Sequence, residues 1–112
     1  IMKLALATLA AALTLSSPAA FAGDAGTTAI EALGKVNGIA LACQQPAVAS
    51  RARNALVTTA PKTRANGEIF ENATNAAYLE QGKGVACPDA ATLAQLVDAA
   101  EKGLQSAFSG AR

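Results

Sequence analysis

The stretch that decides the fold is residues 88–110, PDAATLAQLVDAAEKGLQSAFSG. Its apolar residues recur at the three- and four-residue spacing of one helical face, and they are Leu93, Leu96, Val97, Ala100, Leu104, Ala107 and Phe108. Pro88 is tolerated in a first helical turn, the charge of Asp89 suits the positive end of a helix, and Gly110 can end it. We expect four of these side chains to lie in the core: Leu96, Val97, Leu104 and Phe108.

A first helix is expected over residues 28–43, because the apolar positions before the first cysteine also follow a helical spacing. The residues expected on its inner side are Ile30, Leu33, Val36, Ala40 and Cys43. Two features oppose this helix: Asn37-Gly38 between apolar residues is typical of a hairpin turn, and Gly34 weakens a helix. The alanine-rich flanks do not alternate as strands do, so we favour a helix, with a kink or a turn near Asn37 left open.

Two more helices are expected in the middle of the chain. One runs from Pro46 to Thr59 and is stopped by Pro61. Its inward positions are Val48, Ala52, Ala55, Leu56 and Thr59. The other lies between Thr63, an N-cap residue, and Gln81, although Asn66-Gly67 would delay its start to Glu68. Its inward positions are Ile69, Phe70, Ala73, Ala76 and Ala77, and Gly82 and Gly84 end it.

The first 22 residues have the organisation of a secretory signal peptide. Lys3 follows Met2, and an uncharged apolar run of 12 residues extends from Leu4 to Leu15. A helix of that length rises about 18 Å, well short of the roughly 30 Å of a bilayer core. Residues 16–18 are expected to break the helix, and the small residues of Ala20-Phe21-Ala22 suit signal peptidase. We therefore expect a cleavable signal peptide over 2–22, and a periplasmic or secreted protein beginning at Gly23.

Removal of 22 of the 112 residues leaves 90, enough for one domain, 23–112. Loss of Lys3 from the nine basic residues leaves eight, against eight acidic ones, so the net charge of this domain is near zero. Binding to nucleic acid or to an anionic membrane normally requires a basic surplus, so we expect neither a nucleic-acid partner nor a membrane anchor after cleavage.

Cys43 and Cys87 are the only cysteines in the chain. In a short exported protein an even number of cysteines predicts a disulfide, although two separate thiols remain the alternative. Two cysteines without any histidine make a poor zinc site, because structural zinc takes four nitrogen or sulfur ligands. The fold expected overall is all-α: a small, disulfide-stapled, antiparallel bundle of about four helices.

The residue inventory argues against catalysis, because the chain has no histidine to act as a base near neutral pH. Glu68 and Glu71, three residues apart, share a helix face and are the one ready pair of carboxylates, yet such a pair is usually solvated. No phosphate, nucleotide or calcium-loop motif is present. We therefore expect no catalytic residue, no cofactor site and no metal site.

One local excess of positive charge suggests a contact with a partner, and it comprises Arg51, Arg53, Lys62 and Arg64. The alternative is an ordinary solvated corner, since residues two apart do not share a helix face. The expected function is a non-enzymatic exported module that binds another protein.

In size, helical character and two distant cysteines, the chain resembles the periplasmic acid-stress chaperones of enteric bacteria. It is similar for the same broad reasons to small helical periplasmic immunity proteins, which neutralise secreted effectors. The likeness concerns architecture: the chain lacks the tryptophan and the dense charge of the chaperones, and no residue role carries over. These two families supply the alternative functions, a periplasmic stress chaperone or an immunity-type inhibitor.

Overall fold

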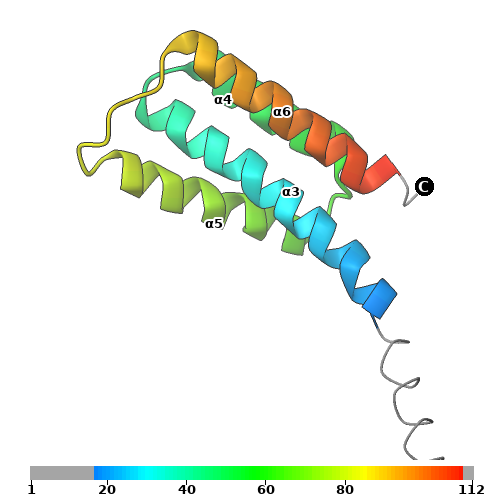
Figure 1. Ribbon diagram of the computed structural model, residues 1–112. Helices are drawn as coiled ribbons and strands as arrows, with labels where there is room; N and C mark the ends of the chain where they lie inside the picture. Colours follow the sequence, from blue (N-terminus) through cyan, green and yellow to red (C-terminus); the bar gives the residue numbers. More distant parts are fainter. Residues whose placement is uncertain (1–16, 110–112) are drawn as a thin grey trace, which may run out of the picture.

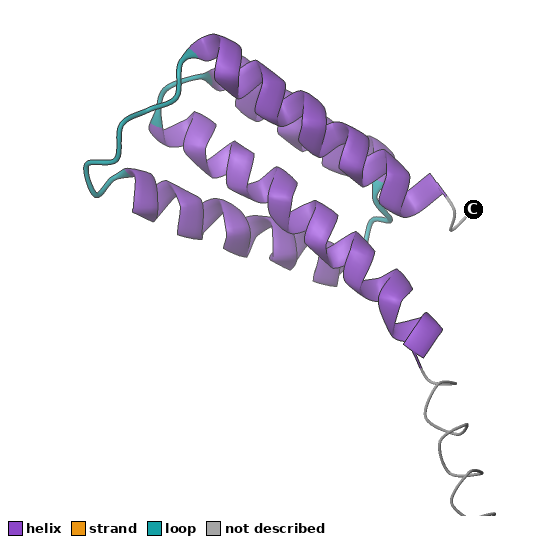
Figure 2. Ribbon diagram, in the orientation of Figure 1, coloured by secondary structure: helices purple, strands orange, loops and turns teal. Residues whose placement is uncertain are grey.

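The computed structural model describes the backbone of residues 17–109 and the side chains of residues 25–109. This part of the chain is all-helical, as predicted, and Figures 1 and 2 show the helices in order: α3 (Ser17–Ala42), α4 (Pro46–Thr59), α5 (Arg64–Gln81) and α6 (Ala90–Ser109). The apolar run of the expected signal peptide and Gly110 lie outside the described residues. No helix in the described part combines the length and the apolar character needed to cross a membrane.

The predicted bounds of α4 and α5 are confirmed, apart from the expected delay at the start of α5. Thr63 caps α5, because its hydroxyl oxygen accepts a hydrogen bond from the backbone N–H of Asn66 at 3.1 Å. The side chain of Asn66 in turn donates to the carbonyl oxygen of Pro61 at 2.9 Å. These two bonds hold the first turn of α5 in place despite Gly67, so the helix begins at Arg64 and not at Glu68.

Helix α3 starts 11 residues earlier than the expected position 28, and it includes the segment where the sequence predicts peptidase cleavage. The helix break expected at residues 16–18 is wrong for Ser17 and Pro18, which lie in the first turn of α3, where proline is tolerated. The hairpin turn suggested by Asn37-Gly38 does not form. The side chain of Asn37 is instead buried, with 1% of its surface exposed, and it donates a hydrogen bond to the hydroxyl of Thr74 on α5 at 3.1 Å. A contact with a residue 37 positions away thus outweighs the local turn preference of Asn-Gly.

Helix α6 begins after Asp89, so Pro88 precedes the helix rather than lying in its first turn. A carboxylate oxygen of Asp89 accepts a hydrogen bond from the backbone N–H of Thr92 at 2.8 Å. This bond lowers the pKa of the exposed Asp89 below its usual value, because it favours the charged carboxylate. The stabilisation of α6 by Asp89 is therefore fully present above the usual pKa, and it is lost as the pH falls through the lowered one.

The core lies where α3, α4 and α6 meet, with Phe70 reaching it from α5. From α6 it contains Leu93, Val97, Ala100 and Leu104, which confirms the predicted stripe. The prediction for Leu96 is wrong, since 39% of its surface is exposed, and Phe108 is only partly buried against the core. Successive helical residues point about 100° apart, so burying Val97 turns the preceding Leu96 toward the edge of the stripe. The prediction that Ala76 of α5 faces inward is also wrong, because this residue is exposed.

Helix α3 is the centre of the bundle and contacts each of the other three helices. Helices α4 and α6 also contact each other, whereas the backbone of α5 lies close to that of α3 alone among the described helices. Figure 1 shows that α3 runs antiparallel to α4 and α6 but parallel to α5. Helices α4 and α6 therefore also run parallel to each other, so the bundle differs from the expected antiparallel arrangement in two contacting pairs, α3 with α5 and α4 with α6.

The predicted disulfide is confirmed, with 5.8 Å between the Cα atoms of Cys43 and Cys87. Cys43 follows α3 directly, and Cys87 lies in the connection from α5 to α6. Both connections lie at the same end of the bundle in Figure 1, so the disulfide ties the end of α3 to the segment that leads into α6.

Two glycines on α3 explain why α5 packs so closely against it. A Cβ atom on Gly34 would lie 2.7 Å from the carbonyl oxygen of Phe70 and 2.8 Å from the Cβ atom of Ala73. A Cβ atom on Gly38 would overlap the carbonyl oxygen of Thr74 and lie 2.8 Å from the Cβ atom of Ala77. These glycines weaken α3 locally, but the contact between the two backbones depends on their lack of a side chain.

Substitution of Gly38 by alanine is expected to destabilise the protein by about 1–3 kcal/mol, because the added methyl group forces the backbone of α5 away from α3. Gly67→Ala is the matched control, since it lies in helix α5 and nothing lies within 4 Å of the added atom. That change should be neutral or stabilising by up to about 1 kcal/mol, because alanine has a higher helix propensity than glycine. Urea denaturation checks both variants, and equal stability of Gly38→Ala and Gly67→Ala would contradict the close α3–α5 contact.

Candidate functional site

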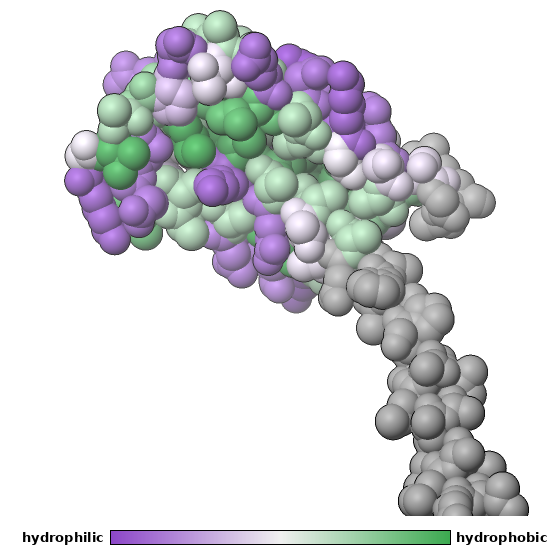
Figure 3. Space-filling view, viewed as in Figure 1, coloured by the Kyte–Doolittle hydropathy of each residue, from purple (hydrophilic) through white to green (hydrophobic). Residues whose placement is uncertain are grey.

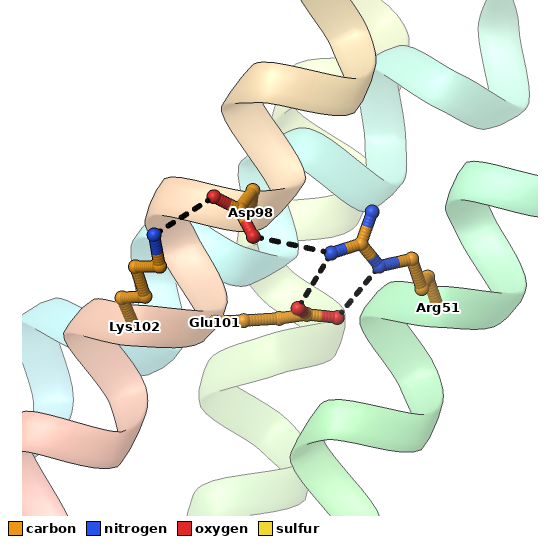
Figure 4. Close-up of polar contacts among 4 residues, drawn as sticks. All are labelled: Arg51, Asp98, Glu101 and Lys102. Carbon is orange, nitrogen blue, oxygen red and sulfur yellow. Dashed lines mark hydrogen bonds and ion pairs between the residues drawn. The ribbon is translucent and has the colours of Figure 1, made fainter.

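Arg51, the first of the basic residues predicted to contact a partner, bridges two helices of this chain. Its guanidinium donates to the two carboxylate oxygens of Glu101 on α6 at 3.0 and 2.8 Å, and to Asp98 at 3.4 Å. Lys102 pairs with the other oxygen of Asp98 at 3.2 Å, as Figure 4 shows. The hydrogen bonds to Glu101 and the nearby carboxylates raise the pKa of Arg51. Two carboxylates of the same chain thus compensate the charge of Arg51.

The other three basic residues are exposed and lie on different segments. Arg53 is on α4, Lys62 is in the connection between α4 and α5, and Arg64 is the first residue of α5. Arg64 makes a long, exposed ion pair of 3.8 Å with Glu68, whereas Arg53 and Lys62 make no ion pair with any described residue. Lys62 and Arg64 thus lie close together in sequence at the start of α5, whereas the side chain of Arg51 contacts α6. A contact of these residues with a partner stays a prediction.

The carboxylates considered for catalysis, Glu68 and Glu71, are both exposed on α5. Glu68 is engaged with Arg64, and neither glutamate lines either of the two grooves described below. Between positions 17 and 109, no three residues of the metal-binding types come close enough to hold an ion.

The feature that the sequence analysis missed is a broad face made by three helices. Helices α5, α3 and α6 lie side by side in Figure 1, and α4 lies behind α6. The side away from α4 has no further helix over it among the described residues. Figure 3 views this side and shows mainly hydrophobic residues across its middle, interrupted by a few hydrophilic ones, and hydrophilic residues along its outer edges.

A groove of about 660 Å³ runs between α3 and α6 on this side. Its lining consists of small residues only: Ala25, Thr28, Ala29, Ala32, Ala99, Ala100, Gly103, Ser106 and Ala107. Leu96 lies three residues before Ala99 and continues the same side of α6, which accounts for its exposure. The groove thus has an uncharged lining of small side chains.

A second groove, of about 620 Å³, runs between α3 and α5. It is lined by Glu31, Lys35, Ile69, Asn72, Ala73, Ala76, Ala77 and Glu80. The linings of both grooves together are called the open face below. The exposed residues of α3 form the ridge between the grooves, and Glu31 and Lys35 are the two charged residues of this ridge in the described side chains.

A sequence signal for the open face exists, although all of its positions except Ala107 lie outside the predicted inward faces. Helix α3 carries a second stripe of small residues at positions 25, 28, 29 and 32, and α6 carries one at 99, 103 and 107. A helix with a single buried face normally shows charged residues opposite that face. Alanine at these positions is compatible with ordinary solvent exposure, so only the tertiary arrangement shows that the two stripes face the same side.

A buried polar pair at the α3–α5 contact belongs to the fold rather than to the open face. Besides accepting from Asn37, the hydroxyl of Thr74 donates to the carbonyl oxygen of Gly34 at 3.2 Å. The side-chain oxygen of Asn37 is buried and has no hydrogen-bond partner among the described residues. Asn37 and Thr74 line neither groove.

Comparison of the chain with protein-family models, with curated proteins and with solved structures found no match to any of them.

Proposed function

We propose that this chain is an exported, non-enzymatic module that binds another protein through the open face. The observation that carries the proposal is the groove between α3 and α6, whose lining is entirely of small uncharged residues although it is open to solvent. A continuous apolar surface on a small domain is a common mark of a protein-binding site. Small side chains also let a partner helix approach closely, because little has to be moved aside.

Two features support the proposal of export. One is the pattern of charge, apolar run and small residues over positions 2–22. The other is the Cys43–Cys87 disulfide, a bond that persists in oxidising compartments and is rare in the cytosol. The absence of histidine supports a role in binding rather than in acid–base catalysis.

The proposal predicts that an arginine in the groove prevents partner binding without unfolding the protein. Ala32→Arg places a long charged side chain on exposed α3 in the groove, and capture of a partner should fall about tenfold or more. Ala94→Arg is the matched control, because Ala94 is also exposed, on α6, but lies outside both grooves. The disulfide-intact protein serves as bait in extract of the producing organism, with captured proteins identified by mass spectrometry.

Both variants should melt within a few degrees of the wild type, as is usual for surface positions. Equal capture by Ala32→Arg and wild type would contradict the proposal. Loss of capture in Arg53→Glu and Lys62→Glu alone would assign the contact to the basic residues instead. Suppression of client aggregation near about pH 4, where carboxylates become protonated, would favour the stress-chaperone alternative.

A further inference from the structure

We propose that the open face binds a second copy of this chain, with α3 packed against α3 around a two-fold axis. This inference rests on the proposed function, because it takes the open face to be a binding surface and names its occupant. A symmetric dimer requires a surface that complements itself. If residue i of the first copy contacts residue j of the second, then residue j of the first copy also contacts residue i of the second. The ridge of α3 meets this requirement in both charge and shape.

The charge complementarity comes from Glu31 and Lys35, one helical turn apart on the exposed ridge. When two copies of α3 cross antiparallel between these positions, Glu31 of each copy lies beside Lys35 of the other. Each copy contributes one acidic and one basic residue, so two intermolecular ion pairs form. A parallel crossing would instead place like charges together, so the charges also select the orientation.

The two residues have no ion pair within the described chain, although their spacing and order favour one. Glutamate four residues before lysine is the favourable orientation for a pair on a helix. At the same spacing the structure pairs Arg64 with Glu68 and Lys102 with Asp98. Glu31 and Lys35 form no such pair, so both charged groups are available to a partner.

The shape of the ridge fits the same occupant. Ala32 lies between the two charged residues and Thr28 lies one turn before it, so the middle of the ridge carries small side chains. Two such ridges can approach closely, and the flanking residues of α5 and α6 then cover the partner's helix. The formal net charge of the whole sequence is only +1, so long-range repulsion between copies is weak.

Charge reversal provides a sharp test by analytical ultracentrifugation. The wild type should sediment as a dimer at high protein concentration and should dissociate into monomers as it is diluted. Glu31→Lys and Lys35→Glu should each weaken the dimer about tenfold or more, because symmetry converts both ion pairs into repulsive contacts at once. The double variant Glu31→Lys/Lys35→Glu should restore the dimer, and an equimolar mixture of the two single variants should form a heterodimer.

Lys62→Glu is the control, since it makes the same charge change away from the open face and should leave the dimer intact. A monomer at every concentration would overturn the inference, as would a dimer whose stability is unchanged by both Glu31→Lys and Lys35→Glu. If the chain is monomeric and Ala32→Arg still abolishes capture of a different protein, the second-copy inference fails while the proposed function stands. If it is dimeric as described and captures nothing else, the open face is a binding surface whose occupant is the second copy, and a partner of different sequence is ruled out.

Discussion

Reduction of the Cys43–Cys87 disulfide should lower the free energy of unfolding by about 4 kcal/mol, the chain-entropy value for a loop of this length. The two cysteines are 44 residues apart in sequence, so the bond closes a loop containing α4 and α5. The effect should be large because the backbone of α5 lies close to that of α3 alone among the described helices. Without the disulfide, α5 is held by that contact, by the packing of Phe70 in the core and by its two connections.

Calorimetry with and without reductant measures this effect, and the melting temperature should fall by roughly 15 °C or more in a domain of this size. The double variant Cys43→Ala/Cys87→Ala should melt like the reduced wild type and should not respond to reductant. In the oxidised protein neither cysteine should react with an alkylating agent. A melting temperature unchanged by reduction would mean that helix packing alone determines the stability.

Leu104→Ala should destabilise the protein by about 2–5 kcal/mol, because it removes a large side chain from the core and leaves a cavity. Leu104 is fully buried, with 0% of its surface exposed, and it packs in the cluster shared by α3, α4 and α6. Urea denaturation followed by circular dichroism measures the change, and the dependence on urea concentration should stay constant.

Leu96→Ala on the same helix is the matched control, since 39% of Leu96 is exposed in the native protein. It should cost about 1 kcal/mol or less. Equal losses of stability from the two substitutions would show that both leucines are buried in the core, as the sequence predicted.

The candidate site was less predictable than the fold. The sequence identified Arg51 as part of a basic cluster, but its partners, Asp98 and Glu101, are 47 and 50 residues away. Pairing across such a distance depends on how α4 packs against α6, which no local pattern specifies. The open face was missed for a related reason: an alanine stripe is compatible with solvent, with a core or with an interface, and its use depends on which helices lie beside it.

The sequence by itself determined the features that arise from interactions within a few residues. Pro46 begins α4, Thr63 caps α5, and the spacing of Leu93, Val97 and Leu104 specifies the buried side of α6. The pairing of the two cysteines was also predictable, because the chain contains no other cysteine.

Only the tertiary structure decided how the helices pair. The sequence shows the local weakness that Gly34 and Gly38 bring to α3, but it does not show that α5 will occupy the space they leave. Likewise, the turn preference of Asn37 is local, whereas its hydrogen bond to Thr74 exists only once α3 and α5 are in contact. Local preferences amount to about 1 kcal/mol or less per residue, and burial and close backbone contact outweigh them when distant segments meet.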